Sequence, residues 1–397
     1  MYKYKMIISP YILLLTIAGF AFVIPILSGR IGVPAVVGEI ICGILLGALG
    51  LSVEGEGQII IDFLASFGLI FLMFLVGMEI DFSIIETRGP KSFIIGFFIF
   101  LFTIAISAYL MSRLGYFDSQ YQYQYQYKYG IFAALLLSSS AVGLTVPTIK
   151  ELGMLKTDYG QTILVSAFIA DFATVLHITV YTLYLQKGLT MEMLMIAVVF
   201  ILFFAVYQLG KLAIWHYPER LSAWFKSDQP SEIGVRASFA LLLVFVALSE
   251  IANVEAVLGA FLAGVMLSLL FRGGTILEQK LYGIGYGFLI PIFFINVGMQ
   301  FDIGALAKGG IYLLPTLLIV ALTVKIVPSL LFIIWHSLRE SIAAGILLSS
   351  RLSLIIAMAA IGLELHLIDK AMESAIILLA LITSIICPTV FRRMHRH

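Results

Sequence analysis

The chain has 397 residues, of which 61% are hydrophobic and 12% are charged, and its mean hydropathy is +1.07. Soluble globular proteins carry about 25% charged residues, so this composition excludes that class and indicates a polytopic membrane protein. A net charge of +1 provides no basic surface for nucleic acid. Cys42 and Cys387 both lie in apolar stretches, which indicates no structural disulfide.

Apolar runs long enough to cross a hydrocarbon core of about 30 Å predict thirteen transmembrane helices. The first run is long enough to span, so we interpret it as an uncleaved helix and not as a signal peptide. An odd number of spans places the two termini on opposite sides. The runs cover residues 10–28, 34–51, 59–78, 91–112, 130–149, 160–185, 190–209, 234–251, 255–271, 281–299, 309–335, 341–363 and 369–391.

The distribution of lysine and arginine predicts the orientation, because cytoplasmic loops collect these residues. Of the 24, seven lie on the side of the N-terminus and fifteen on the other face. The remaining two, Lys325 and Arg351, lie inside apolar runs. We therefore expect a multi-pass protein of the plasma membrane with its N-terminus outside and its C-terminus in the cytoplasm.

A repeated pattern predicts two duplicated halves. Val76-Gly77-Met78 with Asp81 recurs 221 residues later as Val297-Gly298-Met299 with Asp302, and Gly38 and Gly43 recur as Gly259 and Gly264 at the same offset. Spans one to six and eight to thirteen then form two six-helix repeats that enter the membrane in opposite directions. Inverted repeats of this kind build secondary transporters, whose ion site lies near the midplane at broken helices.

The fifth and twelfth spans carry the signals for such breaks. Ser138 to Pro147 combines hydroxyls, a glycine and a proline, and Leu347 to Ser353 is its partner. Pro147 cannot donate to the carbonyl of Gly143, which predicts a free carbonyl facing a cation or water. The alternative is a proline-kinked helix that its serines bind to neighbouring helices. The candidate ligands in the fifth span are Ser139, Ser140 and Thr145.

Asp171 lies near the middle of the apolar segment from Thr162 to Tyr184. A charge in hydrocarbon costs about 2.5–3.5 kcal/mol on insertion scales, so such residues are usually retained for transport. When ionised, Asp171 offers hard oxygen ligands to a small cation, and when protonated it carries a proton. Competition for one site would couple the two ions. The alternative is a carboxylate that only pairs with Lys325 or Arg351.

Other charged residues receive secondary roles. Lys325 either exchanges partners and protons during transport or extends toward an interface. Arg351 keeps its proton, which favours a structural or field-setting role. Glu39 and Glu255 are candidates for lining an aqueous funnel, as well as for binding an ion. His177, about 120° around the helix from Asp171, is interpreted as a hydrogen-bonded packing residue.

The chain shows no phosphate-binding loop, nucleophile elbow or dinucleotide fingerprint. It also shows no metal-site spacing of histidine, cysteine and carboxylate residues. We therefore expect neither an enzyme nor a pump driven by ATP, and no nucleotide domain or cofactor.

Several segments resemble the monovalent cation:proton antiporter-2 family, the membrane domain shared by Kef-type and NapA-type exchangers. The resemblance implies an all-α NhaA/NapA-like fold with crossed broken helices, an ion-binding Asp171 on the sixth span and Lys325 on the eleventh. The segments that carry it are Pro34 to Gly47, Phe74 to Phe82, Ser138 to Pro147 with Glu151-Leu152-Gly153, Leu258 to Ser268, and Phe293 to Met299.

The resemblance also implies a division into a mobile core and a scaffold that dimerises, with elevator-type movement of the core. The scaffold would comprise residues 1–90 and 233–305. The core would comprise residues 91–186 and 306–397, and residues 187–232 would form a linker helix and a cytoplasmic loop.

Two departures from the family pattern bear on function. Ala170 precedes Asp171 where relatives commonly have Asp, Asn or Gln, so Lys325 is free to turn to Asp171, and one titratable carboxylate predicts electroneutral exchange. The segment Ser349 to Ser353 replaces a glycine-rich stretch, which leaves cation selectivity open.

The leading hypothesis is exchange of Na⁺, or Li⁺ or K⁺, for H⁺ by a homodimer among membrane lipids, with Asp171 as the cation-binding residue. The alternatives are Kef-type K⁺ efflux or K⁺/H⁺ exchange and, from another class, a membrane channel or sensor subunit.

Overall fold

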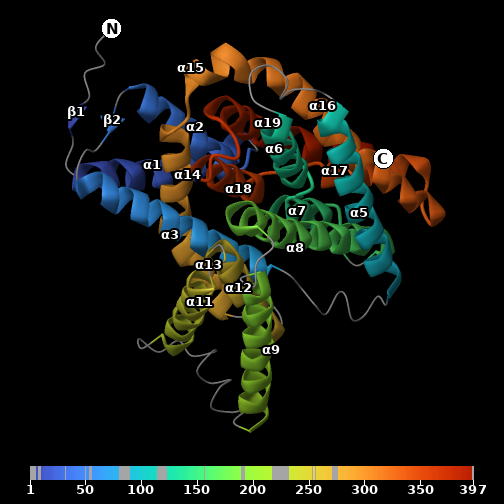
Figure 1. The fold of residues 1–397 in the computed structure, drawn as a ribbon, viewed down its shortest axis with the longest axis horizontal. Coiled ribbons are helices and arrows are strands. Elements are labelled where there is room, and N and C mark those ends of the chain that lie inside the picture. Colours follow the sequence, from blue (N-terminus) through green and yellow to red (C-terminus); the bar gives the residue numbers. More distant parts are fainter. Residues whose placement is uncertain are drawn as a thin grey trace. The chain divides into compact units, whose positions relative to one another are not determined.

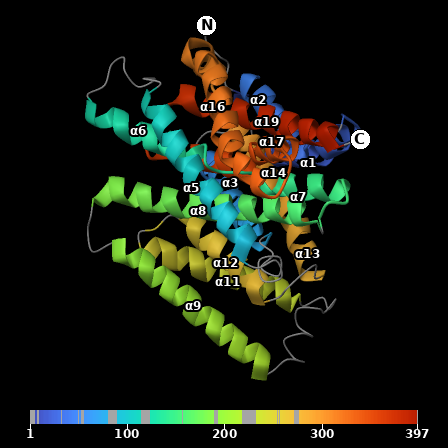
Figure 2. The ribbon, with the colours of Figure 1, turned by 90° about the vertical axis from the view of Figure 1, so that its right-hand side faces the viewer.

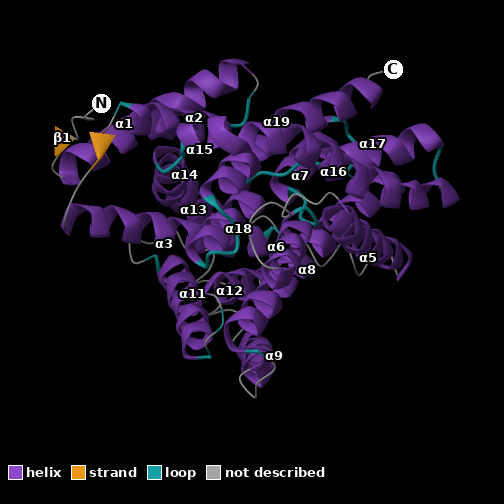
Figure 3. Cartoon of the chain, turned by 45° about the horizontal axis from the view of Figure 1, so that its top comes forward, coloured by secondary structure: helices purple, strands orange, loops and turns teal. Residues whose placement is uncertain are grey.

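The computed structural model describes thirteen stretches of the chain, and helices dominate all of the longer ones (Figure 1, Figure 3). Each predicted apolar run coincides with one or more helices. The chain divides into two compact units, each of which combines two separate stretches of sequence. The described residues are 6–7, 10–31, 33–49, 51–52, 56–79, 90–113, 123–155, 157–188, 193–216, 232–252, 254, 256–270 and 276–395.

The first unit comprises Met1–Phe82 and Thr182–Phe301. A two-residue parallel ladder joins β1 (Met6–Ile7) to β2 (Leu51–Ser52). Helix α9 contacts α12 within this unit (Figure 2). The helices are α1 (Pro10–Ile31), α2 (Ala35–Ala48), α3 (Glu56–Met78), α9 (Met193–His216), α11 (Ile233–Ile251), α12 (Ala256–Leu270), α13 (Ile276–Ile284), the π-helical segment η1 (Gly285–Leu289) and α14 (Ile290–Met299).

Glycines permit the closest helix contacts of the first unit. A Cβ added to Gly43 on α2 would overlap the carbonyl oxygen of Ile295 on α14, and a Cβ added to Gly298 on α14 would overlap that of Ile40 on α2. Small residues allow the backbones of membrane helices to approach and gain van der Waals contact. The two helices therefore pack backbone against backbone at this crossing.

The second unit comprises Ser83–Tyr181 and Asp302–His397. Helix α8 begins in this unit and extends past its boundary at Tyr181. The elements are α5 (Pro90–Arg113), α6 (Tyr123–Leu136), α7 (Val142–Glu151), α8 (Asp158–Lys187), α15 (Ile303–Ala305), the π-helical segment η2 (Leu306–Gly310), α16 (Ile311–Ser329), the 3₁₀ segment η3 (Leu330–Ile334), α17 (Leu338–Leu348), α18 (Ser353–Glu364) and α19 (Lys370–His395).

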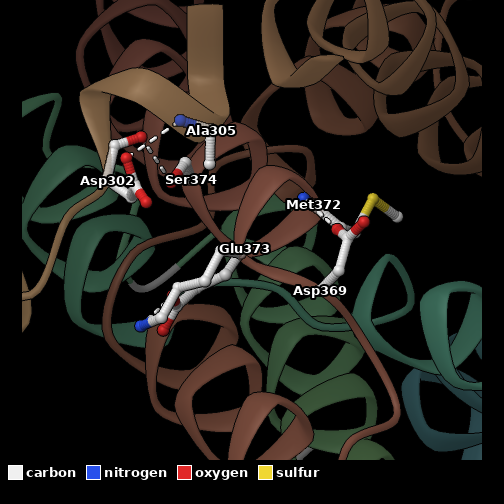
Figure 4. A network of polar contacts seen from close by, with 7 residues as sticks. Asp302, Ala305, Asp369, Met372, Glu373 and Ser374 are labelled. Carbon is white, nitrogen blue, oxygen red and sulfur yellow. Dashed lines mark hydrogen bonds and ion pairs between the residues drawn. The ribbon is translucent and has the colours of Figure 1, made fainter. Parts of the chain in front are cut away.

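Acidic caps fix the starts of α15 and α19 (Figure 4). Asp302 Oδ1 accepts a hydrogen bond from the Ala305 N–H at 2.9 Å, and Asp369 Oδ1 accepts one from the Met372 N–H at 2.8 Å. The side chain of Ser374 donates to the Asp302 carbonyl at 3.5 Å. The two aspartate bonds satisfy backbone donors that a helix start leaves unpaired. The Ser374 bond joins α19 to the start of α15 within the second unit.

The described helices support a polytopic all-helical membrane fold. Eight are long and apolar enough to cross a membrane, and α17 with α18 forms a ninth span bent by 45°. Three more apolar helices, Leu14–Arg30, Ala35–Ala48 and Ala256–Leu270, are shorter. The total of thirteen spans stays a prediction.

We expect Gly43→Ala to lower the midpoint of thermal unfolding by about 3–10 °C, because the new methyl group must push two backbones apart. Gly19→Ala on α1 is the matched control, since a Cβ there meets nothing within 4 Å. Alanine should leave the midpoint unchanged or raise it at Gly19, because alanine favours helix. Thermal unfolding of the purified variants in detergent measures both. Equal midpoints for the two variants would contradict the tight crossing.

Candidate ion site

Both predicted helix breaks are present in the second unit. Helix α6 ends at Leu136 and α7 begins at Val142, and α17 ends at Leu348 and α18 begins at Ser353. The predicted breaks of these two helical segments are confirmed, and their numbering as the fifth and twelfth of thirteen spans stays a prediction. Since lipid cannot satisfy free backbone groups, each break requires polar partners within the protein.

The first break lies before Pro147, and the prediction that the Gly143 carbonyl faces a cation or water stays a prediction. Pro147 and Gly143 both lie inside α7, so the proline does not open the helix. The helix is interrupted earlier, where Ser138 and Ser139 donate their hydroxyls to the carbonyls of Leu135 and Leu136 at 2.6 and 2.9 Å. Serine side chains offer the backbone such alternatives to helical bonding.

The two breaks contact each other in a reciprocal way. The Ser140 side chain donates to the carbonyl of Leu348 at 3.0 Å, and Nη2 of Arg351 donates to the carbonyl of Leu137 at 2.6 Å. Leu348 follows Leu137 by 211 positions, and Arg351 follows Ser140 by the same 211. Residues that share this offset in the two broken helices therefore make exchanged contacts.

Asp171 is buried on α8 with 4% of its surface exposed. One carboxylate oxygen accepts from the Ser140 N–H at 2.8 Å, and the other lies 3.4 Å from the Val142 nitrogen, which donates to it. These donors lie at the N-terminal end of α7, where unpaired N–H groups carry partial positive charge. The carboxylate thus caps a half-helix from a neighbouring helix.

Lys325 on α16 is buried, and its ammonium donates to the Ser138 carbonyl at 2.6 Å. No ion pair within 4.0 Å joins Lys325 to Asp171, although both belong to the described part of the chain. The expected turn of Lys325 toward Asp171 is therefore absent from this structure. The lysine instead binds a carbonyl at the C-terminal end of α6, where partial negative charge collects.

Arg351 is fully buried between the same helix ends. Its guanidinium donates to the carbonyls of Ser349 at 2.8 Å, Leu137 at 2.6 Å and Ala321 at 3.1 Å. Its Nε atom has no hydrogen-bond partner. In the described residues no carboxylate lies within 4.0 Å of this cation, so backbone dipoles balance its charge.

The remaining candidates fall into three groups. Ser139 lies in the break, and Thr145 on α7 donates to the Ala141 carbonyl at 2.8 Å, so both hydroxyl protons are occupied while their lone pairs remain available. Glu39 is buried on α2 of the first unit. Glu255 lies outside the described residues.

His177 is exposed on α8 and forms the predicted hydrogen bond. Its Nδ1 lies 2.7 Å from the Ala173 carbonyl of the same helix, and its ring packs against Phe100 with centroids 5.5 Å apart. It makes no described contact with Asp171.

The sequence reasoning missed the main-chain groups of the site. The carbonyls of Leu137, Ser138, Ala321 and Leu348 accept from the side chains of Arg351, Lys325 and Ser140. Any residue type supplies a carbonyl, so only the location of the breaks could have signalled them.

The family described as "Sodium/hydrogen exchanger, transmembrane" matches residues 18–396. The chain belongs to this family. It is 38% identical over 387 residues to the "Putative Na(+)/H(+) antiporter YjbQ" of Bacillus subtilis, and the match covers 95% of this chain and 62% of that relative. It is 28% identical to the "Probable Na(+)/H(+) antiporter 3" of Methanocaldococcus jannaschii, with 97% of each chain covered.

A solved structure shares the fold of this exchanger. The sodium proton antiporter MjNhaP1 from Methanocaldococcus jannaschii superimposes with a TM-score of 0.68 over 96% of this chain and 95% of that chain. The identity is 15%, so the likeness concerns the fold alone.

We expect Arg351→Met to lower the midpoint of thermal unfolding by about 5 °C or more. Methionine keeps the volume but leaves the carbonyls of Ser349 and Leu137 at the breaks without this donor, and each unpaired buried group costs about 1–3 kcal/mol. Arg236→Met on the exposed surface of α11 is the control. An unchanged midpoint for Arg351→Met in detergent would show that the guanidinium does not hold the breaks together.

Proposed function

We propose that this exchanger moves Na⁺ in one direction and H⁺ in the other by letting them compete for Asp171. One observation carries the proposal: a carboxylate buried in a membrane-spanning helix is held by two backbone N–H groups at a helix break and not by a cationic side chain. The family match and the relatives named Na⁺/H⁺ antiporter support the same conclusion.

The physical basis is the cost of an uncompensated charge. Ionised Asp171 retains lone pairs for a small cation, and the hydroxyl oxygens of Ser139, Ser140 and Thr145 can add further hard oxygen ligands. A bound cation or a bound proton each neutralises the carboxylate, which lowers the cost of moving it through an apolar environment. Moving the empty, ionised site through the apolar environment carries the full cost of the charge. The site therefore moves mainly with a bound cation or proton, which favours exchange over uncoupled movement of either ion.

Lys325 and Arg351 serve as charge-coupling groups in this proposal. Both bind carbonyls at the break, so they offset the dipoles of the half-helices without occupying the carboxylate. Arg351 keeps its charge at all relevant pH values. Lys325, a compact ammonium on a flexible stem, is the group that can change partner during transport.

We extend the proposal to the architecture: thirteen spans in two inverted repeats, as in the antiporter-2 subtype. The close contacts of the first unit support it. Gly43 packs on α14 beside Gly298, and its repeat mate Gly264 packs on α3 beside Gly77, the repeat mate of Gly298. The α2–α14 crossing and the α12–α3 crossing are therefore formed by repeat-related glycines. The reciprocal bonds between the two breaks support the same symmetry.

The two compact units support a core and a scaffold. The unit that contains Asp171 would be the mobile core of an elevator, and the other would be the scaffold that dimerises in the lipid of a plasma membrane. With the N-terminus outside, Glu39 would line a funnel of the scaffold. Glu255, at the start of the predicted ninth span, would be the second candidate for lining a funnel.

We expect Asp171→Asn to reduce exchange by at least about a hundredfold, because an amide neither exchanges a proton nor balances a cation. The exchange rate is measured on purified protein in proteoliposomes, with a pH-sensitive dye and titration by Na⁺, Li⁺ and K⁺. Asp62→Asn on α3 is the matched control, since its Gln58 partner can still donate to the amide oxygen. Wild-type rates in Asp171→Asn would remove this residue from the mechanism.

The same titration separates the alternatives. Saturation by Na⁺ at lower concentration than K⁺ is the expected result. Preference for K⁺ would indicate the Kef-type activity, and flux that follows voltage without saturating would indicate a channel.

We expect the exchange to be electroneutral, because among the described residues Asp171 is the one carboxylate bonded to the breaks, and it binds either one cation or one proton. A voltage-sensitive dye in sealed proteoliposomes, driven by a Na⁺ gradient without ionophores, should report no potential. A potential abolished by Asp171→Asn would instead show that a second proton, for which Lys325 is the candidate carrier, moves in each cycle.

A further inference from the structure

Helix α8 presents a second polar residue to the first break. Thr174 lies one turn beyond Asp171 and is fully buried. Residues three apart on a helix share a face, and the Thr174 hydroxyl oxygen lies 2.8 Å from the Ser138 hydroxyl oxygen. Asp171 and Thr174 therefore both bond to the short segment from Ser138 to Ser140.

The direction of this hydrogen bond follows from counting protons. A hydroxyl has one proton to donate, and the Ser138 hydroxyl donates its proton to the Leu135 carbonyl at 2.6 Å. Thr174 must then donate to Ser138. The bond fixes the rotamer of Ser138, which lies two residues beyond the end of α6.

Two other threonines of α8 bond within their own helix, and Thr162 also contacts the Ser92 hydroxyl of α5 at 3.1 Å. Thr162 and Thr179 donate to the carbonyls of Asp158 and Val175, four residues earlier in the same helix. Such bonds within a helix are common for threonine. The Thr174 hydroxyl instead bonds to Ser138 in the break, so it links α8 to the segment between α6 and α7.

The segment that Thr174 holds anchors both charges of the site. The Ser138 carbonyl accepts from Lys325 Nζ at 2.6 Å, and two residues later the Ser140 N–H donates to Asp171 at 2.8 Å. A shift of this segment changes the surroundings of the acid and of the lysine together.

We infer that Thr174 is a positioning residue for the cation site, an inference that rests on the proposed Na⁺/H⁺ exchange. Its hydroxyl locks residues 138–140 to the helix of Asp171, so that the carboxylate and the oxygens of the break keep the spacing a bound Na⁺ requires. Thr174 acts through Ser138. Its loss therefore weakens cation binding more than it slows turnover.

The test compares Thr174→Val, which keeps the shape and removes the donor, with Thr174→Ser, which keeps the donor. Exchange is measured in proteoliposomes of the full chain at one pH over a range of Na⁺ concentrations. We expect Thr174→Val to raise the apparent KM for Na⁺ about threefold to tenfold, the range that one hydrogen bond supports. The maximal rate should stay within about twofold, and Thr174→Ser should restore the KM.

Thr103→Val on α5 is the matched control, because Thr103 is also fully buried and donates to the Ile99 carbonyl of its own helix. It should leave the KM unchanged. If Thr174→Val fails to fold, Ser138→Ala serves instead, since it removes the acceptor hydroxyl and keeps the carbonyl that binds Lys325. We expect the same rise in KM.

An unchanged KM in Thr174→Val, or a Thr174→Ser variant as weak as the valine variant, would overturn the positioning role while the exchange activity of the wild-type protein stands. Absence of cation-dependent exchange in the wild-type protein would overturn the proposed function and this inference together.

Discussion

The structure of the site depends on one constraint: a helix that breaks within an apolar environment must find partners for its freed N–H and C=O groups inside the protein. Asp171 supplies acceptors to the start of α7, and Lys325 and Arg351 supply donors to the ends of α6 and α17. Each charge balances a helix terminus of opposite sign. Hydrogen bonds from Ser140 and Arg351 to carbonyls of the opposite break join the two interruptions.

This arrangement leaves the carboxylate in a state suited to exchange. A direct salt bridge with Lys325 would satisfy Asp171 permanently, and a transported cation would then have to displace an ammonium. Backbone N–H groups stabilise the negative charge but occupy only part of its lone pairs. The acid is therefore held in place and still able to accept a cation or a proton. The two buried cations bind carbonyls at the breaks and leave the carboxylate unpaired with a cationic side chain.

Both units bring helix backbones together at glycines, and in the second unit a Cβ added to Gly345 on α17 would overlap the backbone of Ile326 on α16. In the first unit glycines bring backbones into contact at the α2–α14 and α3–α12 crossings, which favours a rigid assembly by close van der Waals packing. The second unit adds polar bonds between its broken helices to the same kind of close packing.

The sequence by itself determined the membrane class, the helical runs and both broken spans, because hydropathy and the cost of buried charge are local properties of the chain. It also singled out Asp171, Lys325 and Arg351. Tertiary structure alone decided what these residues bind: Lys325 takes the Ser138 carbonyl and not Asp171, Thr174 holds Ser138, and Pro147 leaves α7 intact. Backbone acceptors have no side-chain signature, and contacts such as that between Arg351 and Leu137 join residues 214 positions apart. Only the folded chain brings them within hydrogen-bonding distance.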